Sequence, residues 1–181
     1  MAAGTTISKG PDAAFLLAHP AHFIALGFGS GLAPTAPGTF GTLAALALYW
    51  ILALVLPPLA IAFLAVPLFF VGIWASEVTA RALGVQDHGA IVIDEIVAFL
   101  PLAAMAAIGN ASIEATLFLQ AVAFGAFRLF DIWKPFPIRQ FEQRLKGGFG
   151  VMFDDLVAAC YAYVVLIVVI VMQHKFFQGA P

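Results

Sequence analysis

The sequence predicts an all-α fold: a polytopic membrane helical bundle of about five transmembrane helices, with an N-terminal interfacial or re-entrant helix and a short amphipathic helix in the last loop. Of the 181 residues, 63% are apolar and 10% are charged, and the mean hydropathy is +1.03. About a quarter of the residues of an ordinary soluble domain are charged. Gly- and Pro-rich turns also divide the apolar residues into runs of helical length. We expect one membrane-embedded domain over residues 13–173, between a flexible N-terminus (1–12) and a C-terminal tail (174–181).

Charge and cysteine content exclude several classes of protein. The net charge of −2 argues against a nucleic-acid partner, which would require a basic face. The single cysteine, Cys160, lies in an apolar run, so no internal disulfide can form. Lys9 is the one basic residue before the first apolar stretch, so the basic region that begins a signal peptide is missing. We therefore do not expect a cleaved signal peptide. The oligomeric state is left open.

The first apolar stretch, residues 13–28, is about 16 residues long and contains His19, Pro20 and His22. Because a spanning helix needs roughly 20 residues, we interpret this stretch as the interfacial or re-entrant helix. Surface or headgroup-facing roles for the two histidines fit better than a ligand role, since nothing nearby chelates.

Residues 27–42 form an uncharged loop, GFGSGLAPTAPGTFGT, that is rich in Gly and Pro and leads directly into a helix. Exposed backbone N–H groups before a helix can hold phosphate, because a helix N-terminus offers unpaired donors and a favourable dipole. The glycine spacing matches neither the dinucleotide fingerprint nor the Walker loop. From composition alone, a plain linker explains this loop equally well.

Five apolar runs follow, each limited by Pro, Gly or charged residues. The first begins near Gly41, and the third must include Asp94 and Glu95 within its first turn, since it would otherwise be too short to cross. Two adjacent carboxylates at membrane depth remain charged only beside a cation or a basic partner. The expected spans are 43–56, 59–83, 91–108, 113–129 and 156–172.

Most of the charge lies in residues 127–156, FRLFDIWKPFPIRQFEQRLKGGFGVMFDDL. Within it, 138–146 places apolar and charged residues on opposite faces, as in a helix lying in the headgroup layer. Gly147, Gly148 and Gly150 are expected to end that helix, and Asp154 and Asp155 to open the last span. The Lys and Arg residues gather at the ends that carry these motifs, which predicts that this face is cytoplasmic.

The acidic residues predicted on this face are hard oxygen ligands without a Cys or His set, which favours Mg²⁺. Such an ion can polarise a phosphoryl group, and nearby basic side chains can neutralise charge on the transferred oxygens. Ordinary juxtamembrane salt bridges are the simpler explanation for Glu77, Arg81, Glu142, Arg139, Arg144 and Lys146. The acids collected on the motif face are Asp87, Asp94, Glu95, Asp131, Asp154 and Asp155, with Arg128, Lys134 and His88 nearby.

Three stretches together closely resemble the bacterial phosphatidylglycerophosphatase A family. They are GSGLAPTAPGTFGTLAA (29–45), DHGAIVIDEIVAF (87–99) and FRLFDIWKPFPIRQFE…GGFGVMFDDLVA (127–158), in the order of the family. The combination is far more specific than any one piece, and the resemblance extends over nearly the whole chain from about residue 15.

The resemblance implies a Mg²⁺-dependent phosphatase that converts phosphatidylglycerophosphate to phosphatidylglycerol and inorganic phosphate at the cytoplasmic face of the bacterial inner membrane. It implies metal ligation by carboxylates, one of which acts as base or nucleophile, and protonation of the leaving alkoxide by His88 with Asp87. Phosphate would be held by Lys134, Arg128 and the backbone of Gly38, Thr39, Gly41 and Thr42. The implied metal ligands are Asp94, Glu95, Asp131, Asp154 and Asp155.

The alternative class is a membrane ion or proton transporter that uses the carboxylate cluster. A transporter would distribute ionisable groups through the depth of the bilayer, whereas here they gather at one face. The patterns expected of CDP-alcohol transferases and of histidine-and-arginine lipid phosphatases are absent from the sequence.

Overall fold

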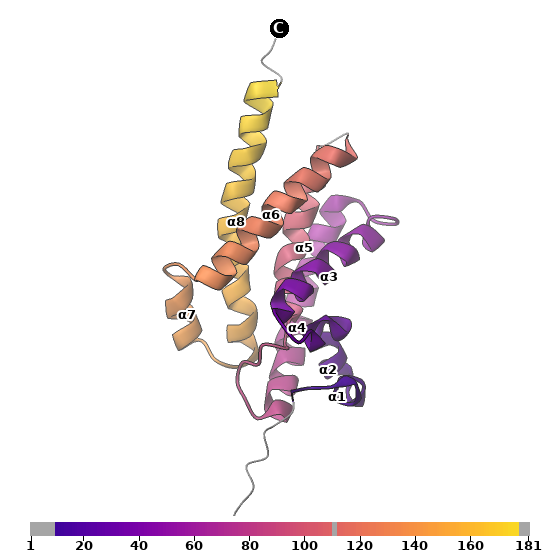
Figure 1. The fold of residues 1–181 in the computed structure, drawn as a ribbon, viewed down its shortest axis with the longest axis vertical. Coiled ribbons are helices and arrows are strands. Elements are labelled where there is room, and N and C mark those ends of the chain that lie inside the picture. The colour runs from indigo at the N-terminus through magenta and orange to yellow at the C-terminus, as the bar shows by residue number, and fades with distance from the viewer. Residues whose placement is uncertain (1–9, 110–111, 178–181) are drawn as a thin grey trace, which may run out of the picture.

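The structure is a computed structural model that describes residues 10–109 and 112–177, and this part of the chain is all-helical. The prediction of an all-α fold is confirmed. The long helices α4, α5, α6 and α8 run roughly lengthwise beside one another, and the last and longest helix extends beyond the others (Figure 1). The helices are α1 (Ala13–Ala18), α2 (Pro20–Ala25), η1 (Gly27–Leu32), α3 (Pro37–Leu52), α4 (Pro58–Leu83), α5 (Ile93–Ala107), α6 (Ile113–Trp133), α7 (Ile138–Arg144) and α8 (Gly147–Phe177).

The expected single N-terminal helix over 13–28 is instead two helices of six residues each, followed by a 3₁₀ segment. Asp12 caps α1 by accepting a hydrogen bond from the Phe15 N–H at 2.9 Å. His19 then has extended backbone and caps α2, where Pro20 takes a first-turn position that needs no N–H. The break therefore follows from Pro20, because proline cannot continue the preceding helix.

Helix α3 begins at Pro37, four residues before the expected start at Gly41. Pro37 is suited to the first turn by its fixed φ and its missing N–H. Gly38 and Thr42 thus lie on the helix and not in the loop, and the Thr42 hydroxyl donates to the Gly38 carbonyl at 2.9 Å. The glycine-rich segment is a 3₁₀ turn, a short connection and a helix start.

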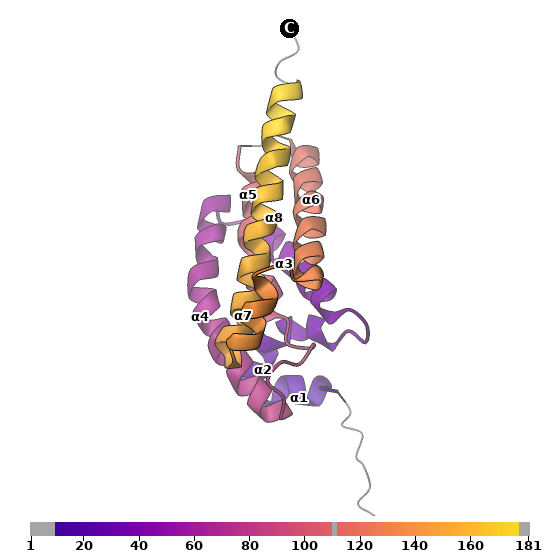
Figure 2. The same cartoon turned by 90° about the vertical axis from the view of Figure 1, so that its left-hand side faces the viewer.

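Helix α5 is at the centre of the bundle, and α3, α4, α6 and α8 all pack against it (Figures 1 and 2). Most of its 15 residues are buried. At its far end from the acidic residues, Gln120 of α6 donates to the Ala103 carbonyl at 3.1 Å and accepts from the Trp50 indole at 3.0 Å. One satisfied polar side chain thus joins α3, α5 and α6 in an otherwise apolar core.

Helix α8 begins at Gly147, nine residues before the expected start of the span at Leu156. Gly147, Gly148 and Gly150 therefore belong to the first turn of α8 and do not form a loop, although Gly147 has a positive φ of 70°. Gly148 lies directly against the backbone of Ile73 on α4, where any side chain would overlap it. Close helix packing, which the sequence did not suggest, is the reason for that glycine.

Three helices of the described chain are long and apolar enough to cross a membrane: 58–83, 113–133 and 147–175. Helices α3 and α5 have 16 and 15 residues and would extend about 22–24 Å, less than a hydrocarbon core of about 30 Å. The five crossings therefore stay a prediction. Most of the predicted flexible N-terminus lies outside the described residues, and α8 continues through residues 174–177 of the predicted tail.

Candidate active site

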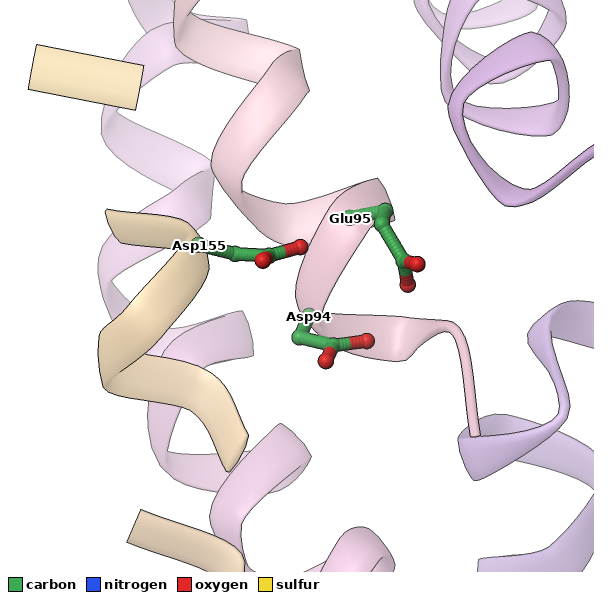
Figure 3. A group of neighbouring side chains, drawn as sticks. All are labelled: Asp94, Glu95 and Asp155. Carbon is green, nitrogen blue, oxygen red and sulfur yellow. The ribbon is translucent and has the colours of Figure 1, made fainter. Parts of the chain in front are cut away.

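Three carboxylates from two helices converge on one point inside the bundle (Figure 3). Asp94 and Glu95 belong to the first turn of α5, and Asp155 extends from α8 toward that turn. One oxygen from each residue lies within 4.8 Å of the other two. Oxygens on opposite sides of a Mg²⁺ or Ca²⁺ ion are about 4–5 Å apart, twice the usual metal–oxygen distance, so the spacing suits a divalent cation.

The carboxylate oxygens at this point are buried and incompletely satisfied. Glu95 is 8% exposed and Asp155 is 4% exposed. Asp94 Oδ1, Glu95 Oε2 and Asp155 Oδ2 have no hydrogen-bond partner among the described residues. Buried charged groups are normally paired or coordinate a metal, because an isolated buried charge is very costly. The donor set of three carboxylates therefore fits a hard divalent cation.

Arg128 of α6 is the basic side chain beside this cluster. Its guanidinium is 3.7 Å from Glu95 Oε1 and 2.7 Å from Asp131 Oδ2, one turn further along α6. Asp131 in turn lies close enough to Asp155 for the two carboxyls to interact. Arg128 Nε is buried without a hydrogen-bond acceptor in the described part of the chain, so the guanidinium retains capacity for an anionic ligand.

The start of α3 closes another side of the cluster. Gly38 lies so close to Glu95 that a Cβ would overlap Glu95 Oε1 and would make a tight contact with the Arg128 guanidinium. The Thr39 and Phe40 N–H groups bond to the Ala36 carbonyl, which leaves the Gly38 N–H as a first-turn donor without an intrahelical acceptor. The missing side chain of Gly38 thus lets Glu95 and Arg128 approach the N-terminus of α3 directly.

Lys134, Glu142 and Asp154 form a second cluster where α6, α7 and α8 meet. The Lys134 ammonium is 2.8 Å from Glu142 Oε1 and 3.5 Å from Asp154 Oδ2. Burial alone would lower the pKa of Lys134, but the hydrogen bond to Glu142 and the neighbouring carboxylates outweigh it and raise this pKa above its usual range. Lys134 therefore remains charged throughout the physiological range.

The backbone of Lys134 has a conformation that is uncommon for a lysine. It ends α6 in the left-handed region, with φ 46° and ψ 63°, where Gly or Asn is usual. A side chain that is retained despite such a conformation suggests a functional role. Here the conformation directs the ammonium toward α7 and α8.

His88 and Asp87 lie in the connection between α4 and α5, at the edge of the site. The His88 ring accepts a hydrogen bond from the Ala90 N–H at 3.1 Å, and Asp87 is exposed. Asp87 is near enough to Asp94 and Asp154 for their charges to interact. Of the remaining predicted phosphate-binding residues, Gly41 packs against Val92 and Thr42 is buried within α3, whereas Thr39 is half-buried at the helix start.

The sequence analysis assigned Glu77 to a surface salt bridge, and the structure adds a second role. Glu77 pairs with Arg81 at 2.7 Å, as expected for side chains four residues apart on a helix. It also accepts a hydrogen bond from the Gly148 N–H at 2.7 Å, so it fixes the start of α8 against α4.

The sequence analysis did not single out the buried hydroxyls of Ser76 and Thr79 on α4, which have no hydrogen-bond partner among the described residues. In the sequence, they could have been noticed as two hydroxyl residues three positions apart, on one face of a helix within a largely apolar run.

Known proteins give a consistent picture. A family model described as phosphatidylglycerophosphatase A matches residues 23–170. The chain is 44% identical to phosphatidylglycerophosphatase A of Haemophilus influenzae over 83% of this chain and 88% of that protein. It is 40% identical to phosphatidylglycerophosphatase A of Escherichia coli, over 78% of each. A Bacteroides thetaiotaomicron protein with the provisional name phosphatidylinositol-3-phosphatase is 38% identical over 80% of this chain and 90% of its own length. No solved structure matches.

The apolar helical bundle and its buried acidic cluster define a helical membrane protein with a candidate site for a cation and a phosphate group. With the family match over most of its length, the chain belongs to the phosphatidylglycerophosphatase A family and is a phosphatase. This membership favours the expected lipid phosphatase over the transporter alternative.

Proposed function

We propose that this protein hydrolyses phosphatidylglycerophosphate to phosphatidylglycerol and inorganic phosphate, with Mg²⁺ held by Asp94, Glu95 and Asp155. The observation that carries the proposal is the convergence of these carboxylates beside Arg128 and Gly38. A site for phosphate monoester hydrolysis needs a cation and a donor set for the phosphoryl oxygens. The residues that could supply both meet at this point of the bundle.

Each side chain has a role that follows from its position. When bound, Mg²⁺ supplies Lewis-acid polarisation of a phosphoryl oxygen and lowers the pKa of a coordinated water. Arg128 and the Gly38 N–H bind phosphoryl oxygens, since both are donors at the edge of the cluster. Lys134 adds positive charge that offsets the charge developing on the transferred group. We propose that His88, with Asp87, returns a proton to the leaving alkoxide, as the resemblance to the family implies.

The ion pairs refine two of the predicted metal ligands. Asp131 holds the Arg128 guanidinium at 2.7 Å, and Asp154 is 3.5 Å from the Lys134 ammonium. We infer that these two acids position the basic groups beside the metal site. Removing a carboxylate that orients the groups around a metal commonly lowers activity about 10- to 100-fold.

We place this site at the cytoplasmic face of the bacterial inner membrane. Arg81, Arg128, Lys134 and the three basic residues of 139–146 lie at or beyond the helix ends that carry the site, while Lys175 lies near the far end of α8. An excess of Lys and Arg in short loops marks the cytoplasmic side. A phosphorylated headgroup at that surface would reach the site from the headgroup layer.

A second headgroup is worth testing because one relative carries the provisional name phosphatidylinositol-3-phosphatase. The experiment measures phosphate release by the purified protein in detergent from phosphatidylglycerophosphate and from phosphatidylinositol 3-phosphate. Each is assayed with Mg²⁺ and with excess chelator.

We expect Mg²⁺-dependent release that strongly favours phosphatidylglycerophosphate. The Glu114→Gln variant should behave like the parent, since Glu114 accepts a hydrogen bond from Ser112 at the opposite end of α6 from the candidate site. Preference for the inositol lipid would replace the proposed substrate, and release that is unaffected by the chelator would contradict the proposed cofactor.

A further inference from the structure

A groove with a volume of about 370 Å³ lies between α4, α5 and α8, next to the three carboxylates. It is lined almost entirely by apolar side chains, including Ala65 and Phe69 on α4, Val97 and Ala98 on α5, and Met152 and Ala159 on α8. Its volume is within the range of about 300–1,000 Å³ typical of ligand pockets. No residue of the candidate active site contributes to its lining.

The groove continues the helix faces that carry the carboxylates. Residues three and four apart lie on the same face of a helix. Val97 and Ala98 follow Asp94 by three and four residues on α5, and on α8 Met152 and Ala159 lie three residues before and four residues after Asp155. A molecule whose charged end contacts the carboxylate cluster would therefore meet this groove with its adjoining part.

The dimensions and openings of the groove suit a lipid chain. Its lining on α8 runs from residue 152 to residue 163, about 16 Å along the helix, close to half of a hydrocarbon core of about 30 Å. The floor at Ala98 is buried, whereas Val66 and Phe70 at the α4 side are 58% and 65% exposed, so the groove is open toward the surrounding lipid. At the far end, the Tyr163 hydroxyl donates to the Pro101 carbonyl at 3.5 Å.

We propose that this groove holds one acyl chain of the lipid phosphate monoester whose phosphate group lies at the carboxylate cluster. The inference rests on the proposed function and adds a part of the substrate that the phosphate chemistry does not specify. One end of the ligand is anionic and meets Arg128 and the cation site, and the other is apolar and fills the groove. A chain held between α4 and α8 would make the protein favour long-chain lipid over phosphate monoesters with short chains.

Cys160 provides a position for testing the groove, because it lines the groove, is exposed and is the chain's only cysteine. The variant Cys160→Trp places a large side chain in the groove from its open edge. Val164→Trp is the matched control, one turn further along α8, 62% exposed and outside the lining. The assay compares KM for a long-chain phosphatidylglycerophosphate with KM for its dihexanoyl analogue.

We expect Cys160→Trp to raise KM for the long-chain lipid about tenfold, with less than about a twofold change for the dihexanoyl analogue. Val164→Trp should change neither value. Equal changes of KM for the two lipids in Cys160→Trp, or the same selectivity change in Val164→Trp, would overturn the groove assignment. A parent protein that releases phosphate from neither lipid would contradict the proposed function itself, and the groove assignment with it.

A second measurement does not depend on a folded variant. A long-chain phosphatidylglycerophosphate with a diazirine at the end of one acyl chain is photolysed with the parent protein, and the labelled peptides are identified. Labelling should fall on segments 62–70, 97–101 and 152–163, and excess unlabelled substrate should suppress it while phosphatidylcholine does not. Labelling spread equally over the exposed face of α6, or equal suppression by phosphatidylcholine, would assign the groove to bulk lipid and overturn the proposal.

Discussion

The carboxylate cluster of Asp94, Glu95 and Asp155 and the ion-pair cluster of Lys134, Glu142 and Asp154 lie side by side but are organised differently. In the carboxylate cluster, Glu95 lies 3.7 Å from the Arg128 guanidinium, no ion pair joins Asp94 or Asp155 to a basic group of the described chain, and each acid keeps a buried oxygen without a hydrogen bond there. In the ion-pair cluster, the ammonium lies 2.8 Å from one acid and 3.5 Å from the other. The carboxylate cluster needs a further cation, whereas both acids of the ion-pair cluster already have a basic partner.

This difference separates chemistry from positioning. A deficit of positive charge in a buried site is stable only if a bound ion corrects it or the acids become protonated. A cluster whose acids are ion-paired, at a junction of three helices, fixes the relative positions of these helices and holds the lysine ammonium at a defined place. Substitutions in the two clusters should therefore differ in their effects on both activity and stability.

The largest effect is expected for Asp155→Asn, which removes one oxygen ligand from the cation site. Phosphate release should fall by more than about 100-fold, beyond the range typical of outer-shell partners. In excess chelator the variant should nevertheless unfold at the same temperature as the parent or a higher one, because it relieves repulsion between buried carboxylates. Phosphate assays and thermal unfolding with chelator check both parts. A less stable variant under these conditions would mean that the three carboxylates do not repel one another in the parent.

Gly38→Ala comes next, because a Cβ at this position would overlap Glu95 Oε1 and crowd the Arg128 guanidinium. We expect phosphate release to fall roughly 10- to 100-fold, the range seen when groups that orient a metal site are displaced. Gly125→Ala on α6 is the matched control, since a Cβ there meets no atom within 4 Å. Parallel measurements of kcat and KM check the prediction. Equal activities of the two variants would show that Gly38 has no special place at the site.

Lys134→Gln should have a smaller effect, about tenfold or more on kcat, because it removes a positive charge near the transferred group. The raised pKa of Lys134 keeps its folded-state charge through ordinary assay conditions, so the loss should be similar at pH 6, 7 and 8. A pH series of kcat for parent and variant measures this. A loss that appears only above pH 8 would contradict the constant charge.

Glu142→Gln should give the smallest effect, a fall of no more than a few fold in phosphate release. Glu142 is partly exposed, and Asp154 also pairs with Lys134, so the lysine keeps one acidic partner when Glu142 is replaced. Exposed ion pairs contribute only about 0–1 kcal/mol. Rates for Glu142→Gln and Lys134→Gln measured together test the order. A larger loss in Glu142→Gln would make Glu142 more than a positioning residue.

The sequence predicted the residues of the carboxylate cluster better than the ends of the helices around it. Charges within apolar runs are costly, so Asp94, Glu95 and Asp155 could be selected without knowledge of the fold. The start of α8 could not, because Gly148 looks like a helix breaker until its close approach to Ile73 is known. The start of α3 at Pro37 was missed because Gly and Pro favour both loops and first turns.

Pairings between distant segments were also beyond the sequence. Lys134 and Glu142 meet only because α7 packs against α8 after a turn, and α5 contacts four other helices despite its 15 residues. The resemblance to a known family supplied the expected roles but no distances. Which three of the five predicted ligands converge on one point is a product of three-dimensional packing.

The most direct test of the account is the effect of Mg²⁺ on the thermal unfolding of the purified protein in detergent, for the parent and for Asp155→Asn. A ligand that binds only the folded state stabilises it by an amount that grows with the logarithm of the ligand concentration above Kd. We predict that Mg²⁺ raises Tm of the parent by several degrees, that chelator reverses the shift, and that Asp155→Asn shows little or none. Equal shifts in the two proteins, or no shift in the parent at Mg²⁺ concentrations that support phosphate release, would contradict a cation site at Asp94, Glu95 and Asp155.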